Sequence, residues 1–236
     1  MSDDSARLAL VGYGRMGRLI ERLAPSHGFE VALRLDEFNN PGGEGLTPEN
    51  FEGVSVAVDF SIPEVVADNA TRLAALGVPL AIGTTGWLDE LPCVREAVER
   101  HGSGLVYAAN FSIGVNAFYR VVEAAAKAMA AQQDYDAFLY EAHHKHKQDA
   151  PSGTALRLLD AMREAGYSRP VDVAAQRCGE FPGIHRIGFD SEADTIVVSH
   201  AARNRVGFAR GALKAARWII GRQGVYDFSR IWDRLG

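Results

Sequence analysis

The chain has 236 residues, of which 47% are hydrophobic and 23% are charged, a composition typical of a globular protein with one large or two small domains. Its formal net charge of -5 offers no basic field to nucleic acid or to an anionic membrane, so we expect neither as a partner. The acidic first residues, the absence of a long apolar run and two cysteines without disulfide or metal spacing predict a cytoplasmic protein.

Short apolar runs alternate with helical patterns over roughly the first hundred residues. The apolar runs predict strands over 7–11, 29–35, 54–60, 78–82 and 105–109. Helical spacing between them predicts helices over 15–24, 63–76 and 88–100. This alternation predicts the α/β class, with a Rossmann-type, doubly wound parallel sheet that has helices on both faces.

The pattern changes after residue 110. An Ala-rich helix is predicted first, and then strands interrupted by a single helix, which indicates a smaller α+β domain. The ranges are helices over 115–131 and 154–165, and strands over 136–143, 171–178, 183–189 and 195–202. A last helix over 209–221 is expected to return to the first domain. The predicted domains are therefore 1–110 with 209–236, and 111–208.

A glycine motif follows the first predicted strand. Residues 8–17 read L-A-L-V-G-Y-G-R-M-G, which places Gly12, Gly14 and Gly17 in the spacing G-x-G-x-x-G. In dinucleotide-binding proteins these glycines allow a tight turn, the approach of a pyrophosphate, and close packing of helix on strand. Asp36 stands at the end of the second strand, 19 residues after Gly17, where a carboxylate accepts hydrogen bonds from a ribose. We therefore predict a nicotinamide dinucleotide as cofactor.

The residues around Asp36 bear on the choice between NADH and NADPH. Glu37 follows it directly, and two carboxylates would repel a 2′-phosphate. Arg15 and Arg34 are the nearby cations that could offset this repulsion. We expect NADH to be preferred, with NADPH as the alternative; a Glu37 that simply faces solvent would weaken this expectation.

The segment 141–155 reads E-A-H-H-K-H-K-Q-D-A-P-S-G-T-A. It gathers three of the seven histidines and two lysines just before a small-residue helix start. Histidines exchange protons near neutral pH, and the free amides of a helix N-terminus bind anions. Ser152 is placed to cap the helix. The segment therefore predicts a site that holds and protonates a small anion. A solvated loop is the plain alternative; we expect no metal, because the lysines would repel one.

At this segment the chain resembles the 4-hydroxy-tetrahydrodipicolinate reductase family, also called dihydrodipicolinate reductase. The resemblance extends over nearly the whole chain, through G-x-G-R-M-G at 12–17, V-D-F-S at 58–61, G-T-T-G at 83–86, A-N-F-S-I-G-V-N at 109–116 and R-C-G-E-F-P-G-I-H at 177–185. It implies a Rossmann domain that carries NAD(P)H, and a second domain that carries the substrate and the contacts of a homotetramer.

The resemblance also implies roles for individual residues. Catalysis falls on His143 and Lys147, either of which could supply the proton. Substrate binding falls on His144, Ser152, Gly153 and Thr154. Apart from the resemblance, the two carboxylates of such a substrate need several positive partners, and Arg177 and Arg205 are weaker candidates, since arginines at such places are often structural ion-pair partners. Cofactor binding falls on Gly12, Tyr13, Gly14, Arg15, Met16, Gly17, Asp36, Gly83, Thr84, Thr85, Ala108, Ala109, Asn110 and Phe111.

The implied reaction is hydride transfer from NAD(P)H to an unsaturated cyclic dicarboxylate, which yields tetrahydrodipicolinate in lysine and diaminopimelate biosynthesis. Two alternatives are an aspartate or homoserine dehydrogenase-like enzyme and a catalytically silent nucleotide sensor. Aspartate and homoserine dehydrogenases lack the E-A-H-H-x-x-K and D-A-P-S-G-T-A pair, and a sensor would not need His143 and Lys147.

Overall fold

The computed structural model describes residues 5–235, which form two compact units. The first unit comprises the residues up to Ile113 together with those from Val206 onward, and the second comprises Gly114–Arg205. The chain thus enters the second unit once and then returns to the first. Within residues 5–235, no helix has both the length and the apolar character needed to cross a bilayer.

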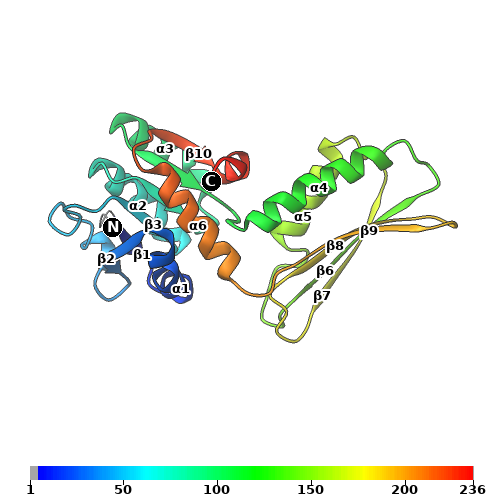
Figure 1. Cartoon of the computed structure of the whole chain (residues 1–236), viewed down its shortest axis with the longest axis horizontal. Coiled ribbons are helices and arrows are strands. Elements are labelled where there is room, and N and C mark those ends of the chain that lie inside the picture. The colour runs from blue at the N-terminus through cyan, green and yellow to red at the C-terminus, as the bar shows by residue number, and fades with distance from the viewer. Residues whose placement is uncertain (1–4, 236) are drawn as a thin grey trace. The chain divides into compact units, whose positions relative to one another are not determined.

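The first unit is built on a six-stranded sheet in the order β10-β5-β4-β3-β1-β2 (Figure 1), and every neighbouring pair is parallel. The strands are β1 (Ala6–Val11), β2 (Phe29–Leu35), β3 (Val56–Asp59), β4 (Leu80–Ile82), β5 (Gly104–Tyr107) and β10 (Gly224–Asp227). The α-helices are α1 (Arg15–Leu23), α2 (Pro63–Ala75), α3 (Leu91–Arg100) and α6 (Val206–Ile219). The expected doubly wound parallel sheet is confirmed.

Alternation along the strands divides the core of this unit between the two faces of the sheet. Leu8 and Leu10 of β1 pack with α1 and α6 on one face. Ala9 and Val11 pack with α2 and α3 on the other. Since both faces are covered, the inner strands β1, β3, β4 and β5 are mainly apolar and largely buried. The edge strands β2 and β10 are partly exposed.

The second unit is a four-stranded mixed sheet in the order β7-β6-β8-β9. Its strands are β6 (Asp136–His143), β7 (Val171–Arg177), β8 (Ile184–Asp190) and β9 (Thr195–Ala201). β6 runs parallel to β7 and antiparallel to β8. The helices α4 (Ile113–Met129) and α5 (Gly153–Glu164) cover one face of this sheet (Figure 1). The predicted α+β character of this segment is therefore confirmed.

The structure differs from the predicted elements in two places. The helix predicted over 88–100 is a short 3₁₀ turn, Leu88–Glu90, followed by α3, because Pro92 stands in the first turn of α3 and has no N–H for a continuous helix. No strand was predicted near the C-terminus, yet β10 pairs with β5 at the sheet edge. Further 3₁₀ turns are Ala24–His27, Pro41–Gly43, Phe228–Arg230 and Trp232–Arg234.

Candidate active site

The glycine turn after β1 shows which glycines the fold itself requires. Gly12 has φ +85, and a Cβ there would lie 2.4 Å from the carbonyl carbon of Phe60. A Cβ on Gly17 would lie 2.5 Å from the oxygen of Gly12. Gly14, in contrast, has φ -82, and a Cβ on it would meet no atom within 4 Å. Its lack of a side chain leaves the N-terminus of α1 open to a phosphate.

A cleft of about 490 Å³ lies beside this turn. Of the predicted cofactor residues, Gly12, Tyr13, Gly14 and Asp36 line it; residues that sequence reasoning missed are Arg18, Phe38, Ser61 and Asn69. One carboxylate oxygen of Asp36 accepts hydrogen bonds from the Phe38 and Asn39 amides at 2.9 and 3.3 Å. Its second oxygen makes no hydrogen bond to the described residues, so it can accept one from a ribose hydroxyl.

Arg34 has a partner inside the protein. Its Nε lies 2.6 Å from the Glu21 carboxylate, and the Tyr13 hydroxyl also donates to Glu21. The hydrogen bonds from Tyr13 and then Arg34 hold the pKa of Glu21 below its usual value. Arg34 is thus engaged, while Arg15 is exposed and Arg18 lines the cleft.

Two further predicted cofactor loops follow β4 and β5 at the same edge of the sheet. Thr84 is buried and donates to Asp59 at 3.3 Å, whereas Thr85 and Ala109 are exposed. Phe111 packs between Phe60 and Phe228 in the core. The Phe111 side chain is therefore not free for a ligand, and only its backbone could contact a cofactor.

The second unit places the predicted catalytic residues at the end of β6. His143 is the last residue of that strand and is 8% exposed. Lys147 lies in the following loop, with its Nζ 2.6 Å from Asp149. Ser152 accepts a hydrogen bond from the Ala155 amide at 3.2 Å, which confirms that it caps α5.

The Asp149 carboxylate occupies the start of α5. Hydrogen bonding to Lys147 is the largest cause that lowers the pKa of Asp149, and the Gly153 amide contributes as well. A carboxylate therefore already lies between Lys147 and the helix N-terminus, the two partners predicted for the substrate. His144 is half-buried at the start of this loop, with its Nδ1 buried and unpartnered among the described residues.

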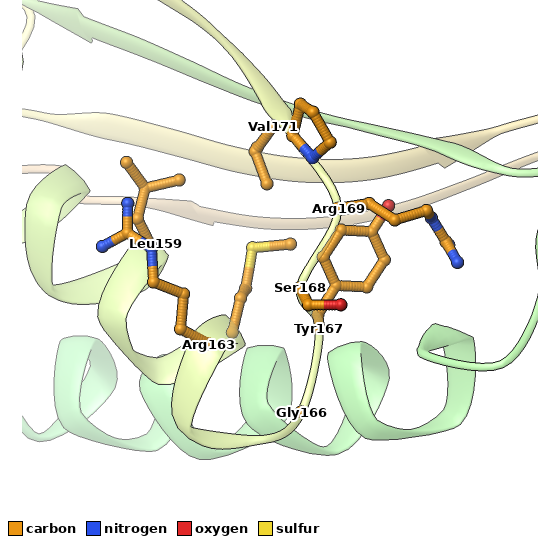
Figure 2. A pocket seen from close by; sticks show the side chains of 9 residues that line it. Leu159, Arg163, Gly166, Tyr167, Ser168, Arg169 and Val171 are labelled. Atoms are coloured by element: carbon orange, nitrogen blue, oxygen red, sulfur yellow. The ribbon is translucent and has the colours of Figure 1, made fainter.

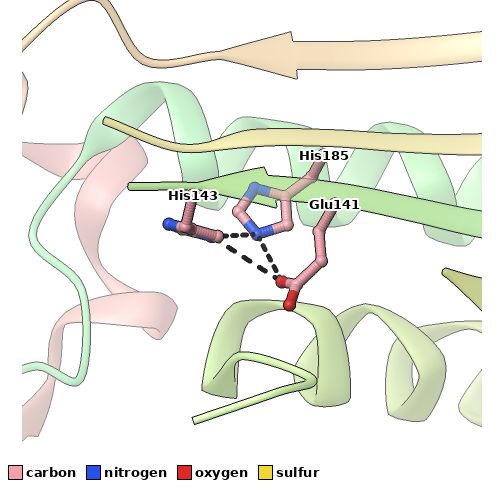
Figure 3. Close-up of side chains that lie close together, drawn as sticks. All are labelled: Glu141, His143 and His185. Atoms are coloured by element: carbon pink, nitrogen blue, oxygen red, sulfur yellow. Dashed lines mark hydrogen bonds and ion pairs between the residues drawn. The ribbon is translucent and has the colours of Figure 1, made fainter. Parts of the chain in front are cut away.

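His143 forms a cluster with two other buried residues, Glu141 and His185, which are not among the site residues predicted from the sequence (Figure 3). Glu141 is 0% exposed and lies 3.6 Å from His143 Nε2 and 3.4 Å from His185 Nε2. The two Nε2 atoms are 3.3 Å apart. Arg177 donates to Glu141 at 2.6 Å. Residues 141 and 143 share one face of β6, a signal that could have placed Glu141 here; His185 comes from β8 and carries no local signal.

The same three side chains have the spacing of a possible metal-ligand set. However, each oxygen of the Glu141 carboxylate already has a donor, from Arg177 and from Ser152. His185 Nδ1 lacks, among the described residues, the acceptor that usually orients a metal-bound histidine. The contacts therefore describe a hydrogen-bonded network, and the absence of a metal stays a prediction.

A second hollow, of about 550 Å³, lies at the C-terminal end of α5, opposite the end that Ser152 caps (Figure 2). Tyr167 and Arg169 line it, and the Arg169 guanidinium stacks on the Tyr167 ring at 4.6 Å. Arg169 also donates to the carbonyl oxygens of Met129, Ala130 and Tyr135. This hollow contains none of the predicted site residues.

Comparisons with known proteins give matches over nearly the whole chain. A family model for the N-terminus of dihydrodipicolinate reductase matches residues 6–111, and one for its C-terminus matches residues 114–231. The 4-hydroxy-tetrahydrodipicolinate reductase of Christiangramia forsetii is 34% identical over 97% of this chain and 98% of its own length. That of Thiobacillus denitrificans is 35% identical over 94% and 97%.

A solved structure shares the fold. The dipicolinate-bound dihydrodipicolinate reductase from Paenisporosarcina sp. TG-14 matches with a TM-score of 0.79 at 21% identity, over 96% of this chain and 99% of that one. Because the family models together match nearly all of the chain and the relatives align over almost their full length, this chain belongs to the dihydrodipicolinate reductase family.

Proposed function

We propose that the chain reduces 4-hydroxy-tetrahydrodipicolinate, by way of dihydrodipicolinate, to tetrahydrodipicolinate with NAD(P)H, in lysine and diaminopimelate biosynthesis. The observation that carries this proposal is the start of α5, where Lys147 and the Gly153 amide hold the carboxylate of Asp149 near His143. Full-length relatives named 4-hydroxy-tetrahydrodipicolinate reductase support the same reaction.

Different residues of the second unit bind the substrate and protonate it. Lys147 and the amides of Gly153 and Thr154 bind one substrate carboxylate in place of Asp149, and His144 lies at the start of the same loop. The nicotinamide, when bound, supplies a hydride. His143 then supplies the proton that the reduced ring system requires, because Lys147 is committed to holding a carboxylate.

Burial lowers the pKa of His143, so the free protein holds this ring mostly neutral at pH 7. Glu141 opposes the lowering, while Lys147 and Arg177 add to it. A bound dicarboxylate would add negative charge beside the ring and favour its protonated form. Binding of the substrate thus prepares His143 to act as an acid.

In the first unit, the open Gly14 backbone and the cleft along Asp36 fit a dinucleotide. We infer that NADH is preferred over NADPH. Glu37 lines the same cleft as Asp36, and Arg34 is paired with Glu21. A 2′-phosphate would therefore be repelled by the carboxylates of Asp36 and Glu37, and Arg34 would not be available to pair with it. Arg18 is a further cation along the cleft, and we assign it to the pyrophosphate.

A steady-state assay with enzymatically generated substrate tests the function. The expected result is loss of nicotinamide absorbance that depends on both substrate and protein. No turnover, together with tight NADH binding, would instead indicate a nucleotide sensor. Turnover of aspartate or homoserine would indicate the alternative dehydrogenases.

The cofactor inference has its own test, the ratio of kcat/KM for NADH and NADPH on one preparation. Glu37→Arg should raise NADPH efficiency because it replaces a repelling carboxylate with a phosphate partner. A wild-type enzyme that favours NADPH would contradict the inference and would identify Arg15 or Arg18 as the phosphate's partner.

We also propose a cytoplasmic homotetramer. The two cysteines, Cys93 and Cys178, are free thiols, as is usual in a reducing compartment. On the face of the second sheet away from α4 and α5, Val173 and Val197 are 40% and 49% exposed beside a hollow of about 540 Å³. Light scattering should give four times the mass of one chain, and Val197→Glu should reduce it.

A further inference from the structure

The buried carboxylate of Glu141 contacts both His143 and Ser152, the residue that caps α5. Glu141 Oε1 accepts hydrogen bonds from the Ser152 amide at 3.0 Å and from Arg177 at 2.6 Å. Its Oε2 accepts from the Ser152 hydroxyl and faces both His143 and His185. Burial would raise the pKa of Glu141, but the hydrogen bonds from Ser152 and Arg177 outweigh it and hold the pKa below its usual value. The carboxylate is therefore charged at neutral pH.

The surroundings of the His185 ring indicate which of its two nitrogens carries the proton. Its Nδ1 is buried and has no partner among the described residues. An unpaired buried N–H destabilises more than an unpaired nitrogen lone pair, so we place the ring proton on Nε2. From there it can reach the Ser152 hydroxyl oxygen at 3.2 Å and His143 Nε2 at 3.3 Å. Burial lowers the pKa of His185 to about 4, so this ring is neutral at pH 7.

The two nitrogens of His143 have different surroundings. The inner atom, Nε2, faces Glu141 and His185. The other, Nδ1, points away from both (Figure 3) and makes no hydrogen bond to the described residues. A Cβ on Gly183 would come within 3.5 Å of Nδ1, so the glycine keeps this side open. The atom free to meet a substrate is Nδ1.

We propose that Glu141 and His185 are positioning residues of the reductase: they hold Nε2 of His143 so that Nδ1–H faces the substrate, while Glu141 also fixes Ser152 at the anion-binding start of α5. This inference rests on the proposed function. In the step itself, the Nδ1–H bond breaks, its electron pair stays on Nδ1, and the proton goes to the atom made electron-rich by the hydride from NAD(P)H. The His143 imidazolium becomes a neutral ring.

The charged groups around His143 come from several elements. Glu141 lies on the same strand, Arg177 on β7 and His185 on β8, while Lys147 and Asp149 lie in the loop before α5. Glu141 and Asp149 raise the pKa of His143, whereas Lys147 and Arg177 lower it. His200 on β9 acts on His185. Removing the Glu141 charge should therefore lower the pKa of His143 further.

The experiment compares Glu141→Gln and His185→Gln with two matched surface controls, Glu164→Gln and His101→Gln. For Glu141→Gln, the pH at which kcat falls on the alkaline side should move lower. For His185→Gln, kcat should fall about 10- to 100-fold with little movement of that pH, because a neutral group has been lost and His143 is misplaced. NADH affinity should not change in either variant, and both controls should match the wild type.

Histidine-selective NMR separates this inference from the proposed reaction. A substrate-free titration should show a lower His143 pKa in Glu141→Gln, and nitrogen shifts should show His185 protonated at Nε2. Unchanged His143 pKa and kcat in folded Glu141→Gln would overturn the proposal. So would a Glu141→Gln that only loses thermal stability while His185→Gln keeps wild-type kcat and KM. If the wild type does not turn over but the NMR results hold, the reaction assignment fails and the positioning role remains.

Discussion

Replacing Lys147 by alanine should weaken the handling of substrate far more than that of cofactor. Lys147 Nζ lies 2.6 Å from the carboxylate of Asp149 near the N-terminus of α5, and the Lys147 side chain is 25% exposed. If a substrate carboxylate takes that place, the variant loses one hydrogen bond between charged groups, which contributes roughly 1.5–3 kcal/mol. This corresponds to a fall of about 10- to 150-fold in kcat/KM for the dicarboxylate.

The assay is steady-state oxidation of NADH at varied substrate concentration, with NADH binding measured separately by fluorescence. Lys145→Ala is the matched control, since Lys145 is an exposed lysine of the same loop and should keep wild-type kinetics. A Lys147→Ala enzyme with wild-type kcat/KM and a normal Tm would refute the reasoning. So would a variant that loses only thermal stability, because Lys147 would then be structural.

His143→Gln should lower kcat about 10²–10⁴-fold with NADH affinity nearly unchanged; near wild-type kcat would exclude an acid–base role. Phe38, which is 85% exposed at the cleft, should stack on the adenine, so Phe38→Ala should raise the KM for NADH severalfold and leave kcat intact, and an unchanged KM would place the ring elsewhere. The pKa of His185 is about 4 in the folded state, below the ordinary histidine value of 6.5. Its contribution to stability is thus full above pH 6.5 and is lost as pH falls toward 4; Tm should fall over that window, and less steeply in His185→Gln. Parallel curves would show that His185 is not responsible.

Local patterns predicted the first unit well because its strands and helices obey local rules. The turn at Gly12 and the alternation of apolar runs with helical spacing are properties of neighbouring residues. Strand β10 was missed because V-Y-D-F is short and flanked by charged and polar residues. Its pairing with β5, more than a hundred residues earlier in the chain, depends on the folded sheet and not on its own sequence.

The candidate site divides in the same way. The spacing of His143, Lys147 and Ser152 was visible in one segment, and the structure brings these residues to the end of β6 and the start of α5. His185 is separated from His143 by 42 positions and joins it only through the pairing of β6 with β8. The shared face of β6 could have placed Glu141 near His143, but its burial could not be derived from the sequence, because a charged residue in a strand is usually exposed.

The return of the chain from the second unit to the first sets an order of events during synthesis. α6 contributes Ala209, Leu213 and Ile219, among others, to the core that α1 and the sheet share, and β10 completes the sheet edge. These parts leave the ribosome after all of Gly114–Arg205. The second unit, being continuous, can therefore fold on the nascent chain first, while the nucleotide-binding sheet stays incomplete until β10 has been synthesised. A protein stopped after Arg205 would carry an ordered second unit attached to an exposed apolar sheet face, so the solubility of the chain depends on the segment that begins at Val206.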